Sequence, residues 1–331
     1  MKKTYMISTA LIVGAFGIAV NAVSFASASE EAGQRFEGNV IVADDFVGTL
    51  IIQTGNFESI SATVQIGSAV GEGDLRAPVL KQKPNGLFIQ GDERAKVRNC
   101  SEAKRIEDQT VQIKGKSKRP LSDFPVLRVT APKDIEIDLQ LDGGRMQVGE
   151  VALAKTQISG CGDILIGDVA EKLRASITGS GNIMTGHLGE LDASLYGSGD
   201  MRFGDVVGEA ELSISGSGDI STGMIGGEAE ISIAGSGGVR SKGGSGSLDV
   251  SIAGSGEVDF IDALFENLDV SIAGSGDVRV FGDVGDVDVS ILGSGDLNVS
   301  DVTGTVSIRQ IGSGDIHVNG HKWTKKGWEK D

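Results

Sequence analysis

The chain has 331 residues, of which 50 are glycine and 5 are proline, and its formal net charge is -16. Proline is too scarce and glycine too irregular for collagen, and so negative a protein is repelled by nucleic acid and by anionic lipid. A hydrophobic fraction of 39% still allows a packed core. We therefore expect a folded protein with no nucleic-acid partner.

Residues 1–28 have the features of a secretory signal peptide. Lys2 and Lys3 precede the apolar stretch Ala10–Val20, and Ala26-Ser27-Ala28 matches a cleavage site. A retained membrane anchor is the alternative, although the apolar stretch is short for a spanning helix. After cleavage we expect no transmembrane segment and an exported protein, either periplasmic or extracellular.

Residues 29–141 are rich in β-forming residues but irregular. Short segments alternate between apolar and polar residues with turn residues between them, which predicts strands. These segments are Asn39–Ala43, Thr49–Thr54, Ala62–Ile66, Leu87–Gln90, Thr110–Ile113, Val126–Thr130 and Ile135–Leu141. We expect this N-terminal portion to close one end of the structure that follows.

A charged insertion, residues 91–120, interrupts these strands. It holds nine Lys or Arg residues and five Asp or Glu residues, so it is basic within an acidic protein. It could dock on the acidic surface of the protein or form a loop, and we favour the loop.

The chain has two cysteines, Cys100 in this insertion and Cys161. An exported protein meets an oxidising compartment, so we expect a disulfide between Cys100 and Cys161, with two free thiols as the alternative. Two cysteines without a histidine cluster do not suit a metal site.

Residues 142–318 consist of a repeat with a period of about 19 residues. Ile, Val and Leu recur two and four residues before the first glycine of a G-S-G-D unit and four residues after it, as in strands that face one interior. So short a period has no room for crossover helices, which predicts an all-β parallel β-helix solenoid with right-handed connections. The units, some with one residue changed, begin at Gly160, Gly179, Gly197, Gly216, Gly235, Gly254, Gly274, Gly293 and Gly312.

Two further columns of polar residues precede the glycines. A serine recurs three residues before the first glycine and an acidic residue five before it, so both should point outward and form a flat acidic face. We predict that this face binds a glycan or cell-envelope polymer, or another copy of the chain, through many weak contacts. The candidate residues are Ser213, Ser232, Ser251, Ser271, Asp249, Asp269 and Asp288.

The acidic residue after G-S-G forms another column. Its carboxylates can accept hydrogen bonds from nearby backbone amides, which is the interpretation that we favour. Stacked carboxylates can also attract Ca²⁺, although the period is not that of a calcium-binding β-roll. The candidate calcium ligands are Asp200, Asp219, Asp277 and Asp296.

The uniform coils argue against an enzyme. Polysaccharide-degrading β-helix enzymes place acid and base groups in a groove built by irregular loops, whereas here every coil repeats the same acids. The histidines are His187, His317 and His321. We therefore predict no catalytic residues, no enzyme activity and no cofactor, and keep polysaccharide degradation as a weaker alternative.

Both ends of a β-helix expose unpaired backbone groups. The tail, residues 319–331, holds Trp323 and Trp328. We expect it to cap the C-terminal end or to follow it.

The serial repeat resembles the bacterial family of auto-transporter adhesin head domains, also called GIN domains. The resemblance rests on units such as 213–219 and 271–277, on Val126–Pro132 and the strand after it, and on short strands within 40–54. It covers about residues 36–318. It implies an exported, non-catalytic β-helical protein of the surface or envelope, either an adhesin or a periplasmic scaffold.

Overall fold

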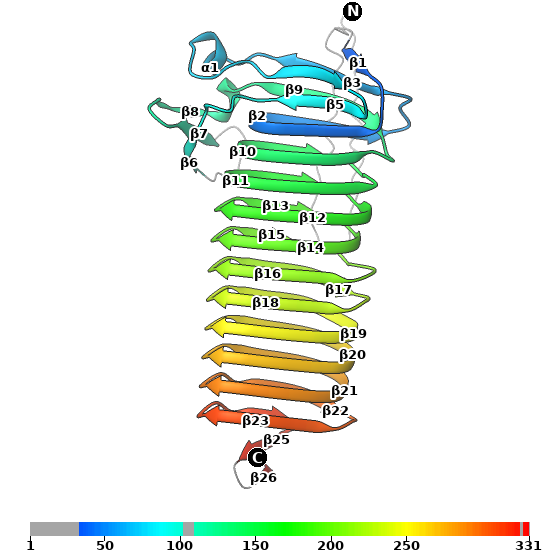
Figure 1. Cartoon of the computed structure of the whole chain (residues 1–331), viewed down its shortest axis with the longest axis vertical. Coiled ribbons are helices and arrows are strands. Elements are labelled where there is room, and N and C mark those ends of the chain that lie inside the picture. The colour runs from blue at the N-terminus through cyan, green and yellow to red at the C-terminus, as the bar shows by residue number, and fades with distance from the viewer. Residues whose placement is uncertain (1–32, 102–108, 325–326, 331) are drawn as a thin grey trace, which may run out of the picture.

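A computed structural model describes residues 33–101, 109–324 and 327–330. The predicted signal peptide, 1–28, lies outside these residues. Almost all of the described chain is β-strand, with a short helix α1 (Ser68–Gly71) and a 3-10 turn η2 (Leu121–Asp123) near the N-terminus (Figure 1). Within the described residues no helix combines the length and apolar character needed to cross a membrane.

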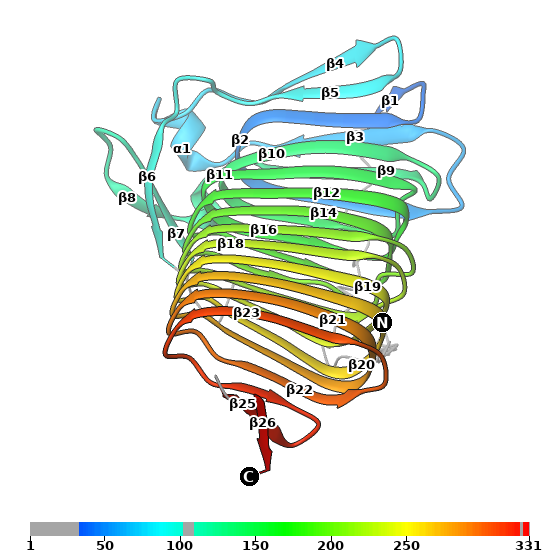
Figure 2. The same cartoon turned by 60° about the horizontal axis from the view of Figure 1, so that its bottom comes forward.

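The chain winds into a stack of coils, which confirms the predicted parallel β-helix (Figures 1 and 2). We call side 1 the sheet whose strands end at the first glycine of G-S-G, and side 2 the sheet whose strands begin after it; a short third side completes each coil. Equivalent residues of successive coils pair in parallel, as Ile231 does with Val250. The strands are β10 (Glu136–Val148), β11 (Leu153–Ile166), β12 (Val169–Gly179), β13 (Asn182–Thr185), β14 (Leu188–Gly197), β15 (Asp200–Arg202), β16 (Ala210–Gly216), β17 (Asp219–Ile225), β18 (Ala229–Gly235), β19 (Gly238–Gly254), β20 (Glu257–Gly274), β21 (Asp277–Gly293), β22 (Leu297–Val302), β23 (Val306–Gly312) and β24 (Ile316–Val318).

The interior of the stack is one narrow apolar core. The columns of Ile, Val and Leu beside G-S-G point inward, and Ile231 and Val250 are fully buried. Phe260 and Phe265 fill the side of the core near the third side, with ring centroids 5.2 Å apart in an edge-to-face contact. Burying an aliphatic or aromatic side chain stabilises a protein by roughly 1.5–3 kcal/mol, so this continuous column holds the coils together.

The first glycine of each unit turns the chain from side 1 to side 2. At Gly235 the backbone φ angle is +142°, a region that other residues avoid. A Cβ atom there would lie 2.2 Å from the carbonyl oxygen of Gly216 in the preceding coil. Both the φ angle and the close approach of successive coils require glycine at this corner.

The stack extends into the N-terminal portion. The predicted strands 39–43 and 49–54 are one strand, β2 (Val40–Gly55), which bends round the corner and pairs in parallel with β10 on both sides. Above β2, side 1 continues with β5 (Gly86–Gln90) and side 2 with β9 (Val126–Pro132). The expected boundary between residues 141 and 142 therefore falls inside β10, within an uninterrupted stack.

Antiparallel strands close the N-terminal end. On side 2, β3 (Ile60–Gln65) pairs with β9, and β1 (Gln34–Phe36) pairs with β3; on side 1, β4 (Val79–Lys83) pairs with β5. Lys81 and Lys83 of β4 each lie over the ring of Phe88. Lysines on an edge strand oppose pairing with a further strand, so this end is protected.

The charged insertion is folded, contrary to the loop that we favoured. It leaves the stack between β5 and β9, at the corner that G-S-G occupies in later coils. Val111 and Ile113 alternate on one face of its middle strand and are buried in a second, smaller core, which the insertion shares with Val47 of β2, Ala69 of α1 and Phe124. Its described strands are β6 (Val97–Ser101), β7 (Thr110–Ile113) and β8 (Lys118–Pro120).

A hairpin follows the last coil. Its strands, β25 (His321–Thr324) and β26 (Gly327–Lys330), are antiparallel, and β25 also pairs with β24 on side 2. Trp323 is half-buried and packs against the end of the core. The tail thus covers side 2 of the last coil (Figure 2).

Candidate ligand-binding face

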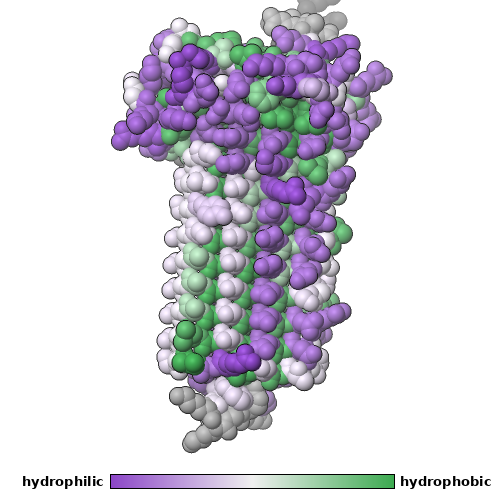
Figure 3. All heavy atoms as spheres, viewed as in Figure 1, coloured by the Kyte–Doolittle hydropathy of each residue, from purple (hydrophilic) through white to green (hydrophobic). Residues whose placement is uncertain are grey.

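The predicted acidic face lies on side 1. In-register pairing stacks Asp249, Asp269 and Asp288 in successive coils, and all three side chains are exposed. The column runs through β14, β16, β18, β19, β20 and β21, and strand spacing places its members about 4.8 Å apart. Figure 3 shows such columns of polar residues running along the stack. Its members are Asp192, Glu211, Glu230, Asp249, Asp269 and Asp288.

A serine column runs beside these carboxylates. Ser232, Ser251 and Ser271 pair in register and are exposed, whereas Ser213 is half-buried. Within the described residues their hydroxyl groups make no hydrogen bond to the protein, so they can donate to and accept from a ligand. The next outward position carries Ala234, Ala253 and Ala273, whose small side chains keep the face flat.

Burial and repulsion raise the pKa of one carboxylate of the acidic column. Partial burial, and then the charges of Asp249 and Asp288 in the adjoining coils, raise the pKa of Asp269 above its usual value. Neighbouring like charges disfavour the ionised form, and a cation placed between them would relieve that cost. The acidic face therefore favours a ligand that brings positive charge or hydrogen-bond donors.

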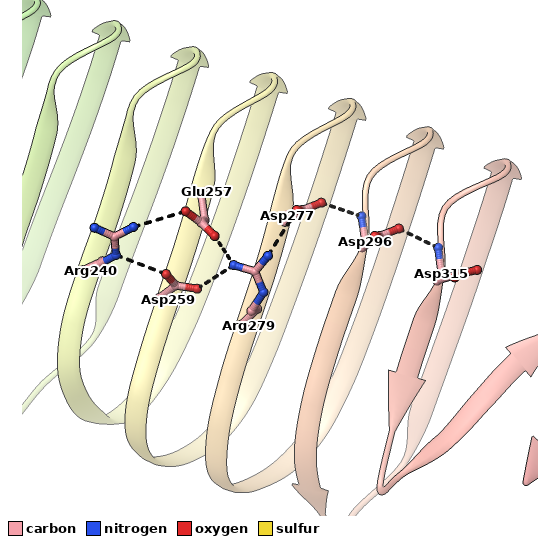
Figure 4. A network of polar contacts seen from close by, with 7 residues as sticks. All are labelled: Arg240, Glu257, Asp259, Asp277, Arg279, Asp296 and Asp315. Carbon is pink, nitrogen blue, oxygen red and sulfur yellow. Dashed lines mark hydrogen bonds and ion pairs between the residues drawn. The ribbon is translucent and has the colours of Figure 1, made fainter. Parts of the chain in front are cut away.

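The carboxylates after G-S-G have another role. Asp277 Oδ1 accepts the backbone N–H of Asp296 at 3.1 Å (Figure 4). In the same way Asp219 Oδ1 accepts the backbone N–H of Gly238 at 2.9 Å. Asp200 instead pairs with Arg202, at 3.0 Å. These bonds support the backbone-capping interpretation of the column.

An ion-pair network neutralises part of side 2. Arg279 contacts Glu257, Asp259 at 3.2 Å and Asp277 at 3.3 Å, while Arg240 lies 3.3 Å from both Glu257 and Asp259 (Figure 4). Its arginines connect three successive coils. Because basic side chains sit among these acids, side 2 carries much less excess negative charge here than the acidic face does.

The four candidate calcium ligands do not converge. Across residues 33–101, 109–324 and 327–330, no three His, Cys, Asp or Glu side chains are grouped to hold one metal ion. Asp219, Asp277 and Asp296 each accept a backbone N–H, and Asp200 binds an arginine. At least one oxygen of each carboxylate is thus already used in a contact within the protein.

Sequence reasoning missed a second set of capping carboxylates, on the third side. Asp168 accepts the backbone N–H of His187 at 2.8 Å, Asp205 that of Met224 at 3.0 Å, and Asp286 that of Thr305 at 2.7 Å. Each aspartate directly follows a glycine and its hydrogen-bond donor lies 19 residues later. The recurring Gly-Asp pair was the available signal.

Cys100 and Cys161 form a disulfide that joins the insertion to the stack, between β6 and β11. Beside it, Asp163 accepts hydrogen bonds from the amide of Gln109 at 2.8 Å and from that of Asn182 at 2.9 Å. A hollow of about 280 Å³ lies between the insertion and the coils there. The disulfide thus anchors the insertion at the corner of the first regular coils.

The fold and the face define a parallel β-solenoid with a repeated polar surface. Residues 204–301 match the family model described as "Putative auto-transporter adhesin, head GIN domain". The resemblance inferred from the repeats is therefore confirmed for this segment, which contains β16 to β21 and most of the acidic face. The family description is of an adhesin head and names no enzyme activity.

No curated protein matches the chain. A solved structure from Parabacteroides distasonis, titled "Putative lipid binding protein", is similar at 16% sequence identity and a TM-score of 0.38. The similarity covers 86% of this chain and 94% of that chain. Nothing about a ligand of this chain follows from so distant a likeness.

Proposed function

We propose that this protein is an exported surface or envelope protein that adheres to a repetitive polymer through its acidic face. The observation that carries the proposal is the column of exposed carboxylates, in register with a column of serine hydroxyls over successive coils. A ligand with groups repeated along its length can contact several coils at once, and many weak contacts then add up.

The chemistry of the face suits a polymer that carries amino or hydroxyl groups, such as a cell-envelope glycan. The carboxylates accept hydrogen bonds and attract cationic groups, and the serine hydroxyls can donate as well as accept. The match of residues 204–301 to an adhesin head domain supports an exported binding protein. Side 2 suits this role less well, because arginines neutralise its acids.

Charge reversal tests the proposal. The triple variant Asp249→Lys, Asp269→Lys, Asp288→Lys changes the acidic face, and its binding would be measured on a glycan array and on insoluble cell-wall polymer. We expect at least a tenfold loss of binding. The control variant Asp262→Lys, Asp283→Lys, Asp301→Lys makes the same change of charge at exposed residues of the third side and should bind normally.

Equal binding by the two triple variants would reject the acidic face as the binding surface. If the unmodified protein bound no glycan and no wall polymer, adhesion would fail and a periplasmic scaffold role would be the better function. We do not propose catalysis, because each coil offers the same acids and none stands apart as an acid or base. Release of reducing sugar from a bound polysaccharide would overturn that view.

A further inference from the structure

The two ends of the stack are closed differently. At the C-terminal end the hairpin β25–β26 covers side 2, but on side 1 the last strand is β23. Within the described residues β23 pairs only with β21, in the coil above it. Its other edge is the end of the side 1 sheet (Figure 2).

The hydrogen-bond pattern of the earlier coils shows which groups of β23 face this open edge. Ala210 donates its backbone N–H to Glu228 in the next coil, and Val287 donates to Thr305 at 2.8 Å. Val306 stands in the same column, one coil after Val287. Since groups alternate along a strand, the N–H and C=O of Val306, Ile308 and Gln310 point away from the stack.

The side chains around this edge differ from those of the earlier coils. The outward position that holds alanine in Ala253 and Ala273 holds Leu292 and Ile311 in the last two coils, and these are 59% and 73% exposed. Val306 and Ile308 are only half-buried, although the equivalent residues of the preceding coil, Val287 and Val289, are buried. Apolar surface therefore gathers beside an unpaired backbone edge.

Charge changes at the same place. The acidic column ends at Asp288, and the next coil has Ser307 in its position; the serine column ends in Arg309. In a chain of net charge -16, the last coil of side 1 therefore lacks the carboxylate of the acidic column and carries a cation instead, which lowers the repulsion between two copies at this end. The protected edge strand β4 at the other end, with Lys81 and Lys83, offers no comparable surface.

We infer that two copies of this chain associate end to end, through antiparallel pairing of their β23 strands about a two-fold axis at Ile308. This register places Val306 opposite Gln310 of the second copy, so the outward N–H and C=O groups of all three residues find partners. Arg309 then faces Ser307 of the second copy. Asp288 of that copy lies beside its Ser307, on the next strand. The side 1 sheets join, and the acidic faces form one longer surface.

Sedimentation equilibrium of the full mature chain tests the dimer. We expect a mass twice that of the monomer at micromolar concentration. Arg309→Asp replaces the attraction between this side chain and Asp288 of the second copy by repulsion and should weaken the dimer at least tenfold. Asp288→Arg combined with Arg309→Asp exchanges the two charges and should restore it. Arg202→Asp, an equal charge change far from β23, should leave the dimer intact.

Val306→Pro provides a second test that does not depend on charge. The N–H it removes bonds to nothing in the described stack, so the dimer should be lost while the monomer stays folded and loses only the packing of one half-buried valine. A monomer at 100 µM would overturn the inference. So would a dimer that both Arg309→Asp and Val306→Pro leave unchanged.

Discussion

The carboxylate of Asp296 accepts a hydrogen bond from the backbone N–H of Asp315, the residue at the same position one coil later, at 2.8 Å. Asp277 does the same for Asp296, so one residue type ties a run of coils together. A bond of this kind lies at the corner, where the chain leaves the regular strand. The repeated aspartate therefore links successive coils by a side-chain to backbone hydrogen bond.

Replacing Asp296 should weaken the stack. Asp296→Ala leaves the N–H of Asp315 without its acceptor, and because the site is exposed we expect a loss of about 1 kcal/mol in the free energy of unfolding, measured in urea. Asp249→Ala is the matched control, because its carboxylate lies in the repulsive column and caps no amide. An equal loss of unfolding free energy in both variants would contradict a stabilising role for this hydrogen bond.

Calcium should not bind to this column. Asp219, Asp277 and Asp296 each use one carboxylate oxygen on a backbone amide, so a metal ion that bound both oxygens of a carboxylate would have to displace such a bond. We expect calorimetric titration with millimolar Ca²⁺ to release no heat beyond dilution, and the melting temperature to stay constant. Saturable heat that disappears in Asp277→Asn would reinstate the calcium hypothesis.

Replacing two glycines of one unit by alanine should have unequal effects on stability. At Gly235 the φ angle is +142° and a Cβ would lie 2.2 Å from a carbonyl oxygen, so Gly235→Ala should cost more than about 2 kcal/mol. At Gly238 a Cβ would lie 3.2 Å from Asp219 Oδ1, beside a hollow of about 70 Å³. Gly238→Ala should be nearly neutral. Urea unfolding compares the two, and equal stability would refute the corner argument.

Reducing the disulfide should release the insertion before it affects the coils. The bond closes a sequence separation of 61 residues, for which a loop-entropy model gives about 4 kcal/mol of stabilisation. We expect dithiothreitol, or Cys100→Ser with Cys161→Ser, to speed proteolysis within 91–120 while the β-sheet circular dichroism persists. Unchanged cleavage would mean that packing alone holds the insertion.

Asp269 and Asp286 should affect stability in opposite directions. Burial and neighbouring charges raise the pKa of Asp269, so its ionised form destabilises the native state and stability recovers as pH falls towards that pKa. The backbone N–H of Thr305 lowers the pKa of Asp286, so its contribution is present at neutral pH and lost as pH falls through the lowered value.

Asp269→Asn should therefore melt higher than the parent at pH 7 and Asp286→Asn lower. The Asp269 difference should shrink as pH falls towards the raised pKa, whereas the Asp286 difference should persist at pH 4 and shrink only below the ordinary aspartate pKa of 3.8. Thermal scans at several pH values measure this. Both are exposed aspartates, Asp269 on side 1 and Asp286 on the third side, so each serves as the control for the other. Shifts of the same sign would show that the local contacts do not decide the effect.

The repeated part of the fold could be predicted from the sequence because every coil places the same residue types at its inward positions and at its corner. Ile233 and Ile252 share one inward column, and Gly235 and Gly254 share one corner, so periodicity alone locates them. The acidic column was found in the same way, since alternation along a strand decides which side chains point outward.

The N-terminal coils could not be predicted in this way. β2 turns its corner at Asp45, with a φ angle of 50°, and at Gly48, with a φ angle of 141°, but no G-S-G-D unit marks the turn in the sequence. Its neighbour β9 comes from 126–132, across an insertion, so the partners lie far apart in the sequence. The strand Thr110–Ile113 was predicted and is β7, but the burial of Val111 and Ile113 was missed because they stand in a stretch whose composition is dominated by charge.

The register of side 1 makes its acidic column a polyelectrolyte. Charges about 4.8 Å apart in water repel by about 0.9 kcal/mol, which exceeds the thermal energy of about 0.6 kcal/mol. Such a line gathers a film of small cations from the medium, much as a nucleic acid does. A cationic polymer that bound here would release those cations. The logarithm of its binding constant would therefore fall linearly with the logarithm of the salt concentration, and each further coil contacted would make the slope steeper.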